Sequence, residues 1–304
     1  MKKTLLLALN LLLCIHSGFV ASRCDDLGIS LEVLGSGGPE LDDGRASSSY
    51  LVWLRGRAVV MIDAGSGSAL NFEKSGADFE DLQALLFTHL HVDHSSAFPA
   101  YIKGSYFTGR DQDLAVFGPA ANKLMPSTSD FVQRTLASNG VFPYLQDYLV
   151  PAMHSPYKIV TRDLSIDKHE IQHIPLTKEI KLSTVPVHHG PVAALAWRVD
   201  IGGCAITFSG DMNNEYETLA RLARNSDLLV MHNAVPESAT GVAAQLHMRP
   251  SEIGKIASKA RAKRVLVSHR MNRTTGTEAE TLRYIRQSYT GPVSFAEDLD
   301  RLDW

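Results

Sequence analysis

The stretch Leu85-Leu86-Phe87-Thr88-His89-Leu90-His91-Val92-Asp93-His94 joins a short apolar run to three histidines and one aspartate within six residues. The apolar run predicts a buried strand. His89 and His91 are two positions apart, so their rings point the same way in an extended segment. Asp93 and His94 follow where the chain turns, and they can reach a second position nearby. Imidazole and carboxylate are the ligands that Zn²⁺ and similar ions prefer, so this stretch predicts parts of two neighbouring metal sites.

A polar loop that is merely rich in histidine is the alternative interpretation. The chain holds 12 histidines in 304 residues, so one stray pair would be unremarkable. The spacing directly after a strand is not expected by chance, and we favour the metal interpretation. His154, His169 and His173 have no ligand spacing around them and are expected to be surface residues.

The start of the chain has the pattern of an export signal. Met1-Lys2-Lys3 is followed by an almost wholly apolar run from Leu5 to Ile15 and then by small residues at Val20-Ala21-Ser22. This order predicts a secretory signal over residues 1–22. The apolar run is well short of the ~20 residues that a membrane span needs. We therefore expect an exported, periplasmic or secreted protein with no stable membrane insertion after cleavage.

Charged side chains are nearly balanced, with 30 Lys and Arg against 33 Asp and Glu. Loss of Lys2 and Lys3 with the signal would change the formal net charge from −3 to −5. No block of Lys and Arg stands out, so the electrostatic footprint of a nucleic-acid binder is missing. We therefore expect no nucleic acid among the partners.

Two cysteines, Cys24 and Cys204, remain after residue 22. An exported compartment would permit a disulfide between them. Cys204 also lies in an apolar, strand-like run, where a buried thiol is an equally good interpretation. Both alternatives stay open from the sequence, as does the oligomeric state.

No internal repeat or linker divides the chain after residue 22, which predicts one domain over residues 23–304. A hairpin is expected across Gly56, between strands at 50–54 and 58–62. Apolar spacing predicts helices at 216–223 and 253–260. Residues 103–173 are the least regular part, and they either cover the site as a lid or pack as ordinary surface.

A site for two metals needs more ligands, and three further strand-like runs end in residues of the right type. Val185-Pro186-Val187 leads to His188-His189-Gly190, Ile206-Thr207-Phe208-Ser209-Gly210 leads to Asp211, and Val265-Leu266-Val267-Ser268 leads to His269. Any one of them alone would more often be a satisfied polar residue at a strand end. Their repetition favours a metal constellation built from several strand ends.

These pieces resemble the metallo-β-lactamase superfamily. The matching segments are Ile62-Asp63-Ala64-Gly65, Thr88-His89-Leu90-His91-Val92-Asp93-His94, Val187-His188-His189-Gly190, Ser209-Gly210-Asp211 and Ser268-His269, and they come in the family's order. The resemblance implies an α/β fold, a four-layer αββα sandwich with two metals at one edge where its sheets meet. Zn²⁺ is the expected metal.

The resemblance also implies the ligand set. One zinc would be held by His89, His91 and His189, the other by Asp93, His94 and His269, with Asp211 as the bridging carboxylate. Asp63 matches the family's structural aspartate, which orients a ligand. His188 is the alternative to His189, and we prefer His189 because it directly precedes glycine.

Within the superfamily, the chain is most similar to the ribonuclease Z-like branch, which includes zinc-dependent arylsulfatases. The segments that carry this similarity are Leu34-Gly35-Ser36-Gly37-Gly38-Pro39, His189-Gly190-Pro191-Val192, Met231-His232-Asn233-Ala234 and Gln245-Leu246-His247-Met248. His247 matches a histidine that assists at the metal site in that branch. Asn233 stands where the branch has the glutamate that supports this histidine, and this departure disfavours strict ribonuclease Z chemistry.

These observations predict an exported dinuclear hydrolase of a small anionic ester, a phosphodiester or an aryl sulfate. A metal-bridged hydroxide would attack the ester, and Asp93 and His247 are the expected catalytic residues, with His247 donating a proton to the leaving group. A buried, hydrogen-bonded histidine is the plainer interpretation of His247. A lactonase or glyoxalase-like thioester hydrolase is the alternative function, and a non-catalytic binding protein is the least favoured.

Overall fold

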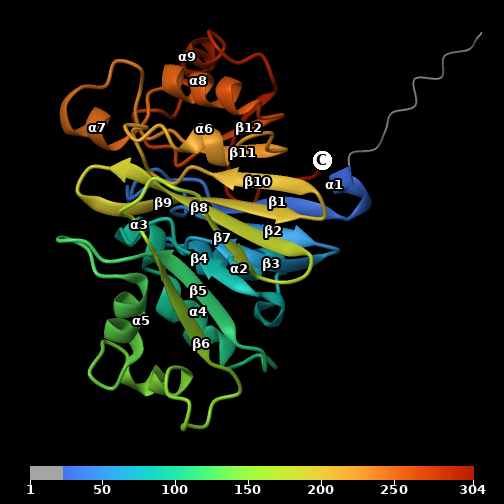
Figure 1. Ribbon diagram of the computed structural model, residues 1–304, viewed down its shortest axis with the longest axis vertical. Helices are drawn as coiled ribbons and strands as arrows, with labels where there is room; N and C mark the ends of the chain where they lie inside the picture. Colours follow the sequence, from blue (N-terminus) through green and yellow to red (C-terminus); the bar gives the residue numbers. More distant parts are fainter. Residues whose placement is uncertain (1–22) are drawn as a thin grey trace, which may run out of the picture.

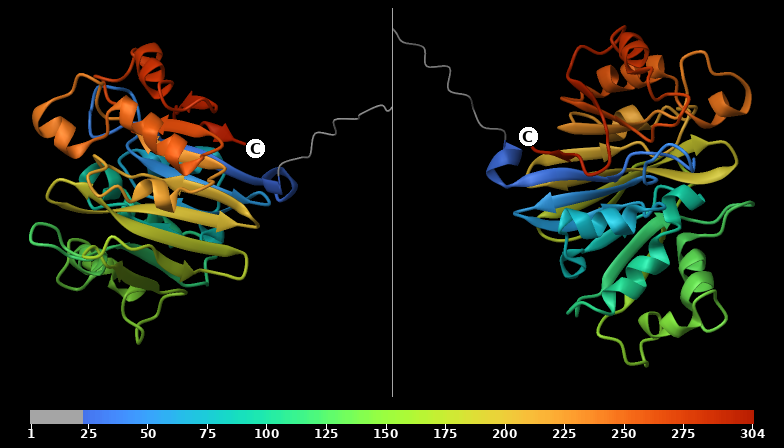
Figure 2. Two further views of the ribbon diagram at one scale, coloured as in Figure 1. Left: turned by 45° about the horizontal axis from the view of Figure 1, so that its top comes forward. Right: turned by 180° about the vertical axis from the view of Figure 1, so that it is seen from behind.

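The computed structural model describes residues 23–304, and the predicted signal at residues 1–22 lies outside the described residues. The described chain folds into two seven-stranded sheets. The sheets face each other, and helices cover the outer side of each (Figure 1). Two further views show the same layers, with α8 and α9 on one side and α4 and α5 on the other (Figure 2). The expected four-layer αββα sandwich is confirmed.

The first sheet combines a parallel part with an antiparallel edge. Strands β3 to β6 run parallel, whereas β14, β1 and β2 pair antiparallel beside them. In spatial order the strands are β14 (Arg301–Leu302), β1 (Ile29–Gly35), β2 (Ser49–Leu54), β3 (Arg57–Ile62), β4 (Ala84–Leu86), β5 (Leu114–Pro119) and β6 (Ile159–Leu164).

The second sheet repeats this plan. Strands β10 to β13 run parallel, whereas β7, β8 and β9 are antiparallel. In spatial order the strands are β13 (Val293–Phe295), β12 (Val265–Ser268), β11 (Leu228–His232), β10 (Cys204–Phe208), β9 (Val192–Ile201), β8 (Ile180–His189) and β7 (Gln172–Pro175). In each sheet, the carboxyl ends of several parallel strands therefore lie along one edge. Ligand sites of α/β proteins form at such edges.

The helices fill the two outer layers and the loops at the strand ends. They are α1 (Arg23–Asp26), α2 (Ser68–Ser75), α3 (Val92–Ser95), α4 (Phe98–Ser105), α5 (Thr128–Leu136), α6 (Leu219–Leu222), α7 (Gly241–Leu246), α8 (Pro250–Ala260) and α9 (Glu278–Ile285), with short 3₁₀ turns η1 (Phe79–Asp81) and η2 (Pro143–Tyr148).

Three hydrophobic cores hold the layers together. The central core lies between the sheets and includes the fully buried Trp197. One outer core packs Phe98 of α4 and Val132 of α5 against the first sheet. The other packs Ile253 of α8 and Ile285 of α9 against the second. Burial of a side chain of this size contributes roughly 1.5–3 kcal/mol, so the cores fix how the two sheets sit at the edge where their strands end.

Local chemistry explains the predicted hairpin. Strands β2 and β3 are joined by Arg55 and Gly56, with φ of 50° and 77°. Two positive φ values are typical of a type I′ turn, whose twist matches that of the flanking strands. The strands expected on both sides of Gly56 are confirmed, and each begins one residue earlier than expected.

Two expectations of regular structure need correction. The helix expected over residues 216–223 is only α6, because Glu217 takes a left-handed φ of 50° that cannot lie inside an α-helix. Within residues 103–173, the strand at 114–117 and the helical spacing at 131–136 correspond to β5 and α5, and η2 and β6 add regular structure that the sequence did not indicate. Asn122 in this region donates to the Pro191 carbonyl at 2.9 Å, beside the turn after His189. Whether the region acts as a lid stays a prediction.

Of the two alternatives left open for the cysteines, the structure shows the disulfide, which joins Cys24 and Cys204. Both residues are buried. The bond ties α1, the first described element, to the start of β10. Within the described residues, no helix is both long enough and apolar enough to cross a bilayer.

We predict that the disulfide stabilises the fold measurably. It closes a loop across a sequence separation of 180 residues, and such cross-links typically contribute about 2–4 kcal/mol. The double variant Cys24→Ser/Cys204→Ser should lose free energy of unfolding in this range, measured by urea titration. The unaltered protein in excess reductant should match the variant, and an unchanged denaturation midpoint in both would contradict the prediction.

Candidate metal centre

The first ligand segment leaves the first sheet at the end of β4. Strand β4 ends at Leu86, and two residues later the Thr88 backbone amide donates to the carboxylate of Asp63 at 2.7 Å. His89 follows at once, and His91 lies directly before α3. Helix α3 then carries Asp93 and His94 on its single turn, so a few residues deliver all four side chains to the sheet edge.

Asp63 organises this segment from below. Its buried carboxylate accepts hydrogen bonds from the Thr88 amide, from Thr88 Oγ1 at 2.8 Å and from His94 Nδ1 at 2.8 Å. A carboxylate that accepts Nδ1–H fixes the tautomer of a metal-binding histidine and leaves Nε2 for the metal. The role expected for Asp63 therefore matches its contacts.

The adjacent residues His188 and His189 point in opposite directions from β8. His189 Nδ1 donates to the Leu246 carbonyl at 2.9 Å, and its Nε2 lies 3.4 Å from His91 Nδ1. His188 Nδ1 instead lies 3.0 Å from the side-chain oxygen of Asn213. Side chains alternate along a strand, so only His189 reaches the cluster, as preferred from the sequence.

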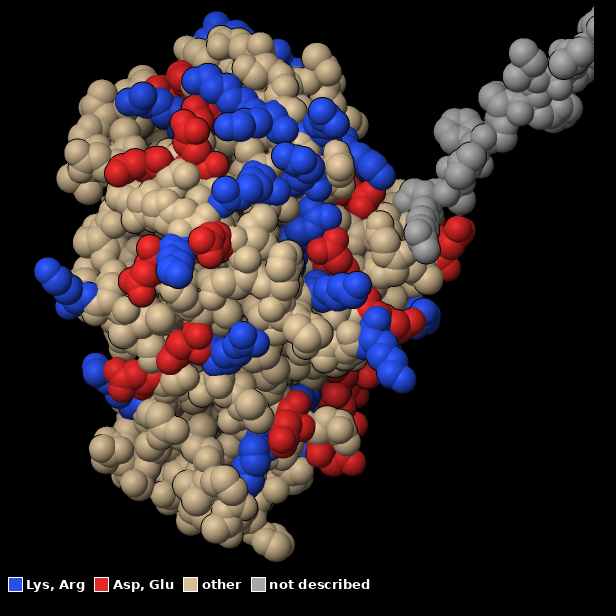
Figure 3. Space-filling model, in the orientation of Figure 1, with Lys and Arg blue, Asp and Glu red and all other residues tan. Residues whose placement is uncertain are grey.

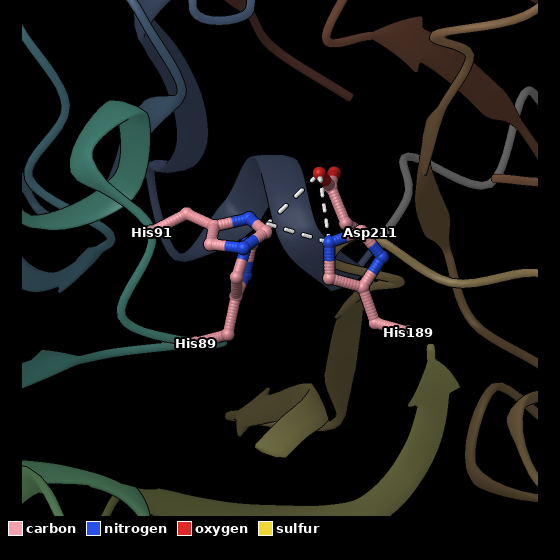
Figure 4. A group of neighbouring side chains, drawn as sticks. All are labelled: His89, His91, His189 and Asp211. Atoms are coloured by element: carbon pink, nitrogen blue, oxygen red, sulfur yellow. Dashed lines mark hydrogen bonds and ion pairs between the residues drawn. The ribbon is translucent and has the colours of Figure 1, made fainter. Parts of the chain in front are cut away.

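The first group of side chains converges on one oxygen of Asp211 (Figure 4). Its ligand atoms, from His89, His91, His189 and Asp211, all lie within 4.8 Å of one another. Asp211 Oδ2 is 4.0 Å from His89 Nε2 and 3.8 Å from His189 Nε2. Three nitrogens and one carboxylate oxygen at such spacing suit a divalent ion such as Zn²⁺.

The second group lies on the other side of the same oxygen. Asp211 Oδ2 is 3.3 Å from His269 Nε2 and 3.7 Å from His94 Nε2. Asp93 Oδ2 is 3.2 Å from His269 Nε2 and 3.5 Å from His94 Nε2. Ligands at the ~2.0–2.1 Å bond lengths of a tetrahedral zinc site lie about 3.4 Å apart. The four side chains therefore have the spacing of a second metal site.

Sequence reasoning missed the role of His232, which ends β11. Its Nδ1 donates to Asp211 Oδ1 at 2.8 Å, and its Nε2 lies 3.0 Å from the hydroxyl of Tyr50. Burial lowers the pKa of His232 to about 4, which keeps the ring neutral. His232 also lies in a group with His94, Asp211 and His269 whose ligand atoms are within 4.8 Å of one another. Because both of its ring nitrogens have protein partners, its contacts favour orienting Asp211 over binding metal. The sequence did offer one indication of a role at the site. His232 ends a strand that runs parallel to β10 and β12, which lead to Asp211 and His269.

His247 follows α7 at the rim of the cluster. Its Nδ1 lies 3.8 Å from Asp211 Oδ2, and 11% of its side chain is exposed. Burial is the main cause that lowers its pKa to about 3. Asn233 does not support it, because the side-chain amide of Asn233 donates to the Val235 carbonyl instead. The missing glutamate is therefore not replaced by this asparagine.

The donor set fits divalent metal ions. The Nε2 atoms of His89 and His94 are buried without a hydrogen-bond partner, which is costly unless a ligand occupies them. Burial lowers the pKa of His89 and of His189, so both rings are neutral and can donate a lone pair. Burial opposes charge on His94 as well, yet Asp93, Asp63 and Asp211 together raise its pKa. The second group therefore favours added positive charge, which a cation supplies.

The sequence model of the β-lactamase superfamily domain matches residues 59–270, a range that contains every proposed ligand. The chain belongs to the β-lactamase superfamily. It is thus a metal-dependent hydrolase of that superfamily, and the resemblance based on the motifs is confirmed.

Relatives within the superfamily indicate the branch. Ribonuclease Z of Picrophilus torridus is 25% identical over 270 residues, which cover 79% of this chain and 85% of the relative. Ribonuclease Z of Mycobacterium bovis is 24% identical over 289 residues, which cover 90% of this chain and 98% of the relative. Both support the ribonuclease Z-like branch.

Solved structures share the fold at lower identity. The metallo-β-lactamase fold protein YhfI from Bacillus subtilis has a TM-score of 0.70 and 19% identity, and the match covers 91% of this chain and 99% of that one. The short form of human tRNase Z has a TM-score of 0.68 and 19% identity, with coverage of 90% and 98%. These similarities show the fold alone.

The expectation that nucleic acid is not a partner was wrong. It is contradicted by the two relatives described above. Both are named ribonuclease Z, and both align with this chain over most of their length. The physical reason is that a net charge sums over the whole surface and says nothing about where cations gather. Lys and Arg do gather on one part of the molecule, over the face that carries α6 and α8 (Figure 3).

We predict that His189→Ala and His188→Ala differ sharply in metal content. His189→Ala removes a ligand of the first group and should lower the metal content measured by elemental analysis from about two per chain to about one. His188→Ala is the matched control and should keep both metals, because His188 faces Asn213. Equal metal content in the two variants would contradict the assignment.

A second prediction concerns His232. Replacement by leucine removes the donor to Asp211 Oδ1 and should weaken metal binding by roughly 10–100-fold, as loss of an orienting residue usually does. Replacement by asparagine keeps a side-chain N–H near the same position and should weaken binding less. Metal affinity measured in a chelator competition tests this, and unchanged affinity in the leucine variant would exclude the orienting role.

Proposed function

We propose that this protein is a dinuclear metal-dependent phosphodiesterase that hydrolyses phosphodiester bonds of RNA. The observation that carries the proposal is the position of Asp211 Oδ2, which faces His89 and His189 on one side and His94 and His269 on the other. A carboxylate between two ligand groups is the arrangement that two-metal hydrolases need. The ribonuclease Z relatives support RNA as the substrate class.

The chain's own residues would divide the work at this site. His89, His91 and His189 would hold one ion, Asp93, His94 and His269 would hold the other, and Asp211 would be shared between the two groups. Two divalent ions in such a site lower the pKa of water towards ~7 and neutralise charge on the phosphoryl oxygens. Asp63 and His232 keep His94 and Asp211 in the orientations that binding requires.

His247 is the candidate for proton transfer. Burial leaves it neutral at pH 7, so it would have to take a proton from the attacking water before it passes one to the leaving oxygen. Nδ1 faces Asp211 Oδ2, which leaves Nε2 to meet the leaving group. Asp93 would contribute as a metal ligand of the second group, because its carboxylate lies beside His94 and His269.

We also infer that the mature protein works outside the cytoplasm. The signal predicted at residues 1–22 and the disulfide between Cys24 and Cys204 support this, because disulfides persist mainly in oxidising compartments. Mass spectrometry of the exported fraction should find a chain that begins at or near Arg23. Recovery of only the chain that begins at Met1 in the cytosol would contradict the inference.

A panel of substrates tests the function. We expect the zinc-loaded protein to cleave a labelled hairpin RNA and bis-p-nitrophenyl phosphate, and to leave p-nitrophenyl sulfate, a lactone and a thioester unchanged. Asp211→Asn should lower kcat/KM for both phosphodiesters by more than about 100-fold, since losing a bridging ligand exceeds the 10–100-fold cost of losing an orienting residue. The control His188→Ala should keep its activity. Turnover of only the sulfate or the thioester would contradict the proposal.

The same panel separates the two interpretations of His247. If it returns the proton, His247→Ala should lower kcat by about 10²–10⁴-fold for RNA, whose leaving group is a poor one. The nitrophenolate of the small diester leaves without protonation and should be affected much less. Equal effects on both substrates would instead indicate a histidine that only packs at the site.

A further inference from the structure

We propose that a basic face around α6 and the end of α8 docks the RNA substrate at a distance from the metal centre. We call it the α6–α8 basic face and define it as Lys181, Arg221, Arg224, Lys259 and Arg261. The inference rests on the proposed function, because it gives a second contact to the same substrate.

Cations are concentrated in the chain that builds this face. Residues 249–264, which contain α8, hold six Lys and Arg and one acidic residue, Glu252. The space-filling view shows Lys and Arg crowded over α6, α8 and the neighbouring loops, in a protein whose formal net charge is negative (Figure 3). The charge is therefore distributed unevenly, which creates a local positive potential.

The residues of the face come from separate segments that the fold joins. The loop after α6 meets the end of α8, where the Asn225 amide donates to the Ala260 carbonyl at 2.7 Å and the Lys263 amide donates to the Ser226 carbonyl at 2.9 Å. Arg224 and Arg261 stand next to these contacts in the sequence. The two segments that carry these cations are therefore held side by side.

Carboxylates leave most of this charge uncompensated. Across residues 23–304, no ion pair to a carboxylate involves Lys181, Arg221, Arg224 or Arg261, and all four are exposed. Lys259 approaches only Glu217, at 3.9 Å. Exposed cations that repel one another gain most from a polyanion, because each phosphate contact releases bound counterions.

A groove of about 490 Å³ runs beside the face. Lys181, Arg221 and Arg224 line it, and Leu182 and Leu222 are among its apolar lining residues. Its one carboxylate, Asp200, is already neutralised by Arg198 at 2.8 Å. A groove with cations and an apolar wall suits the sugar–phosphate backbone of a nucleic acid.

The distance to the metal centre sets a length requirement. Strand β8 contains both Lys181 at the groove and His189 at the metal centre, eight residues apart. At ~3.3 Å per residue this spans roughly 26 Å, or about eight steps of a stacked strand at ~3.4 Å each. The face should therefore affect long RNA and leave short substrates unaffected.

The experiment compares two charge reversals of equal size. Arg224→Glu/Arg261→Glu alters the face, and Arg57→Glu/Arg134→Glu alters two exposed arginines on the first-sheet side. Binding of a fluorescein-labelled 30-nucleotide hairpin RNA is measured with Asp211→Asn also present, so that cleavage is slow during the measurement. The face variant should bind the RNA at least ~10-fold more weakly at 0.1 M salt. The slope of log K against log salt concentration should become shallower by about 1 for each phosphate contact that is lost. The control variant should bind like its parent.

Activity assays without Asp211→Asn complete the test. The face variant should lose kcat/KM on the hairpin RNA and keep it on bis-p-nitrophenyl phosphate, with an unchanged unfolding temperature. Equal RNA affinity of the two charge variants would overturn the inference, while continued turnover of the small diester would leave the proposed function standing. Loss of binding to phosphatidylglycerol vesicles with RNA binding intact would overturn it in favour of a membrane. Failure of the unaltered protein on both phosphodiesters would overturn the proposed function together with it.

Discussion

Both candidate metal sites depend on one carboxylate oxygen, Asp211 Oδ2. Asp211 Oδ2 lies within 4.0 Å of nitrogens from five histidines, which are His89, His94, His189, His247 and His269. A buried carboxylate is costly unless its charge is compensated. Burial would raise the pKa of Asp211, yet His269, His94 and His247 together hold it well below its usual value. Negative charge at this point is what allows two groups of ligands to face one position from both sides.

The two-sheet architecture explains how so many ligands reach that oxygen. Asp63 and His89 come from the ends of β3 and β4 in the first sheet, whereas Asp211 and His269 come from the ends of β10 and β12 in the second. Neither sheet alone supplies a complete group. The central core between the sheets therefore fixes ligand spacing as well as stability, because any sliding of one sheet would separate the two sets.

The sequence predicted candidate ligands best where a histidine or an aspartate comes directly after a strand. His89, His91, Asp211 and His269 could be recognised as candidate ligands because a histidine or aspartate directly after an apolar run is not expected to recur at several strand ends by chance. His232 has the same setting, but its role depends on which oxygen of Asp211 it meets, and the sequence does not encode that contact locally.

Other features depended on long-range contacts and were missed or left open. Cys24 and Cys204 are separated by 180 positions, so their pairing was undecided until the fold placed α1 beside β10. The basic face joins Lys181, Arg224 and Arg261 from three separate segments, and counting charges along the chain could not reveal it. That is why nucleic acid was wrongly excluded.

The most direct test of the central claim is a crystal structure of the zinc-loaded protein with anomalous difference density collected at the zinc edge. We predict two peaks, one bounded by His89, His91 and His189 and the other by Asp93, His94 and His269, with a carboxylate oxygen of Asp211 in contact with both. A single peak, or two peaks with Asp211 bound to only one of them, would contradict the account of a shared carboxylate.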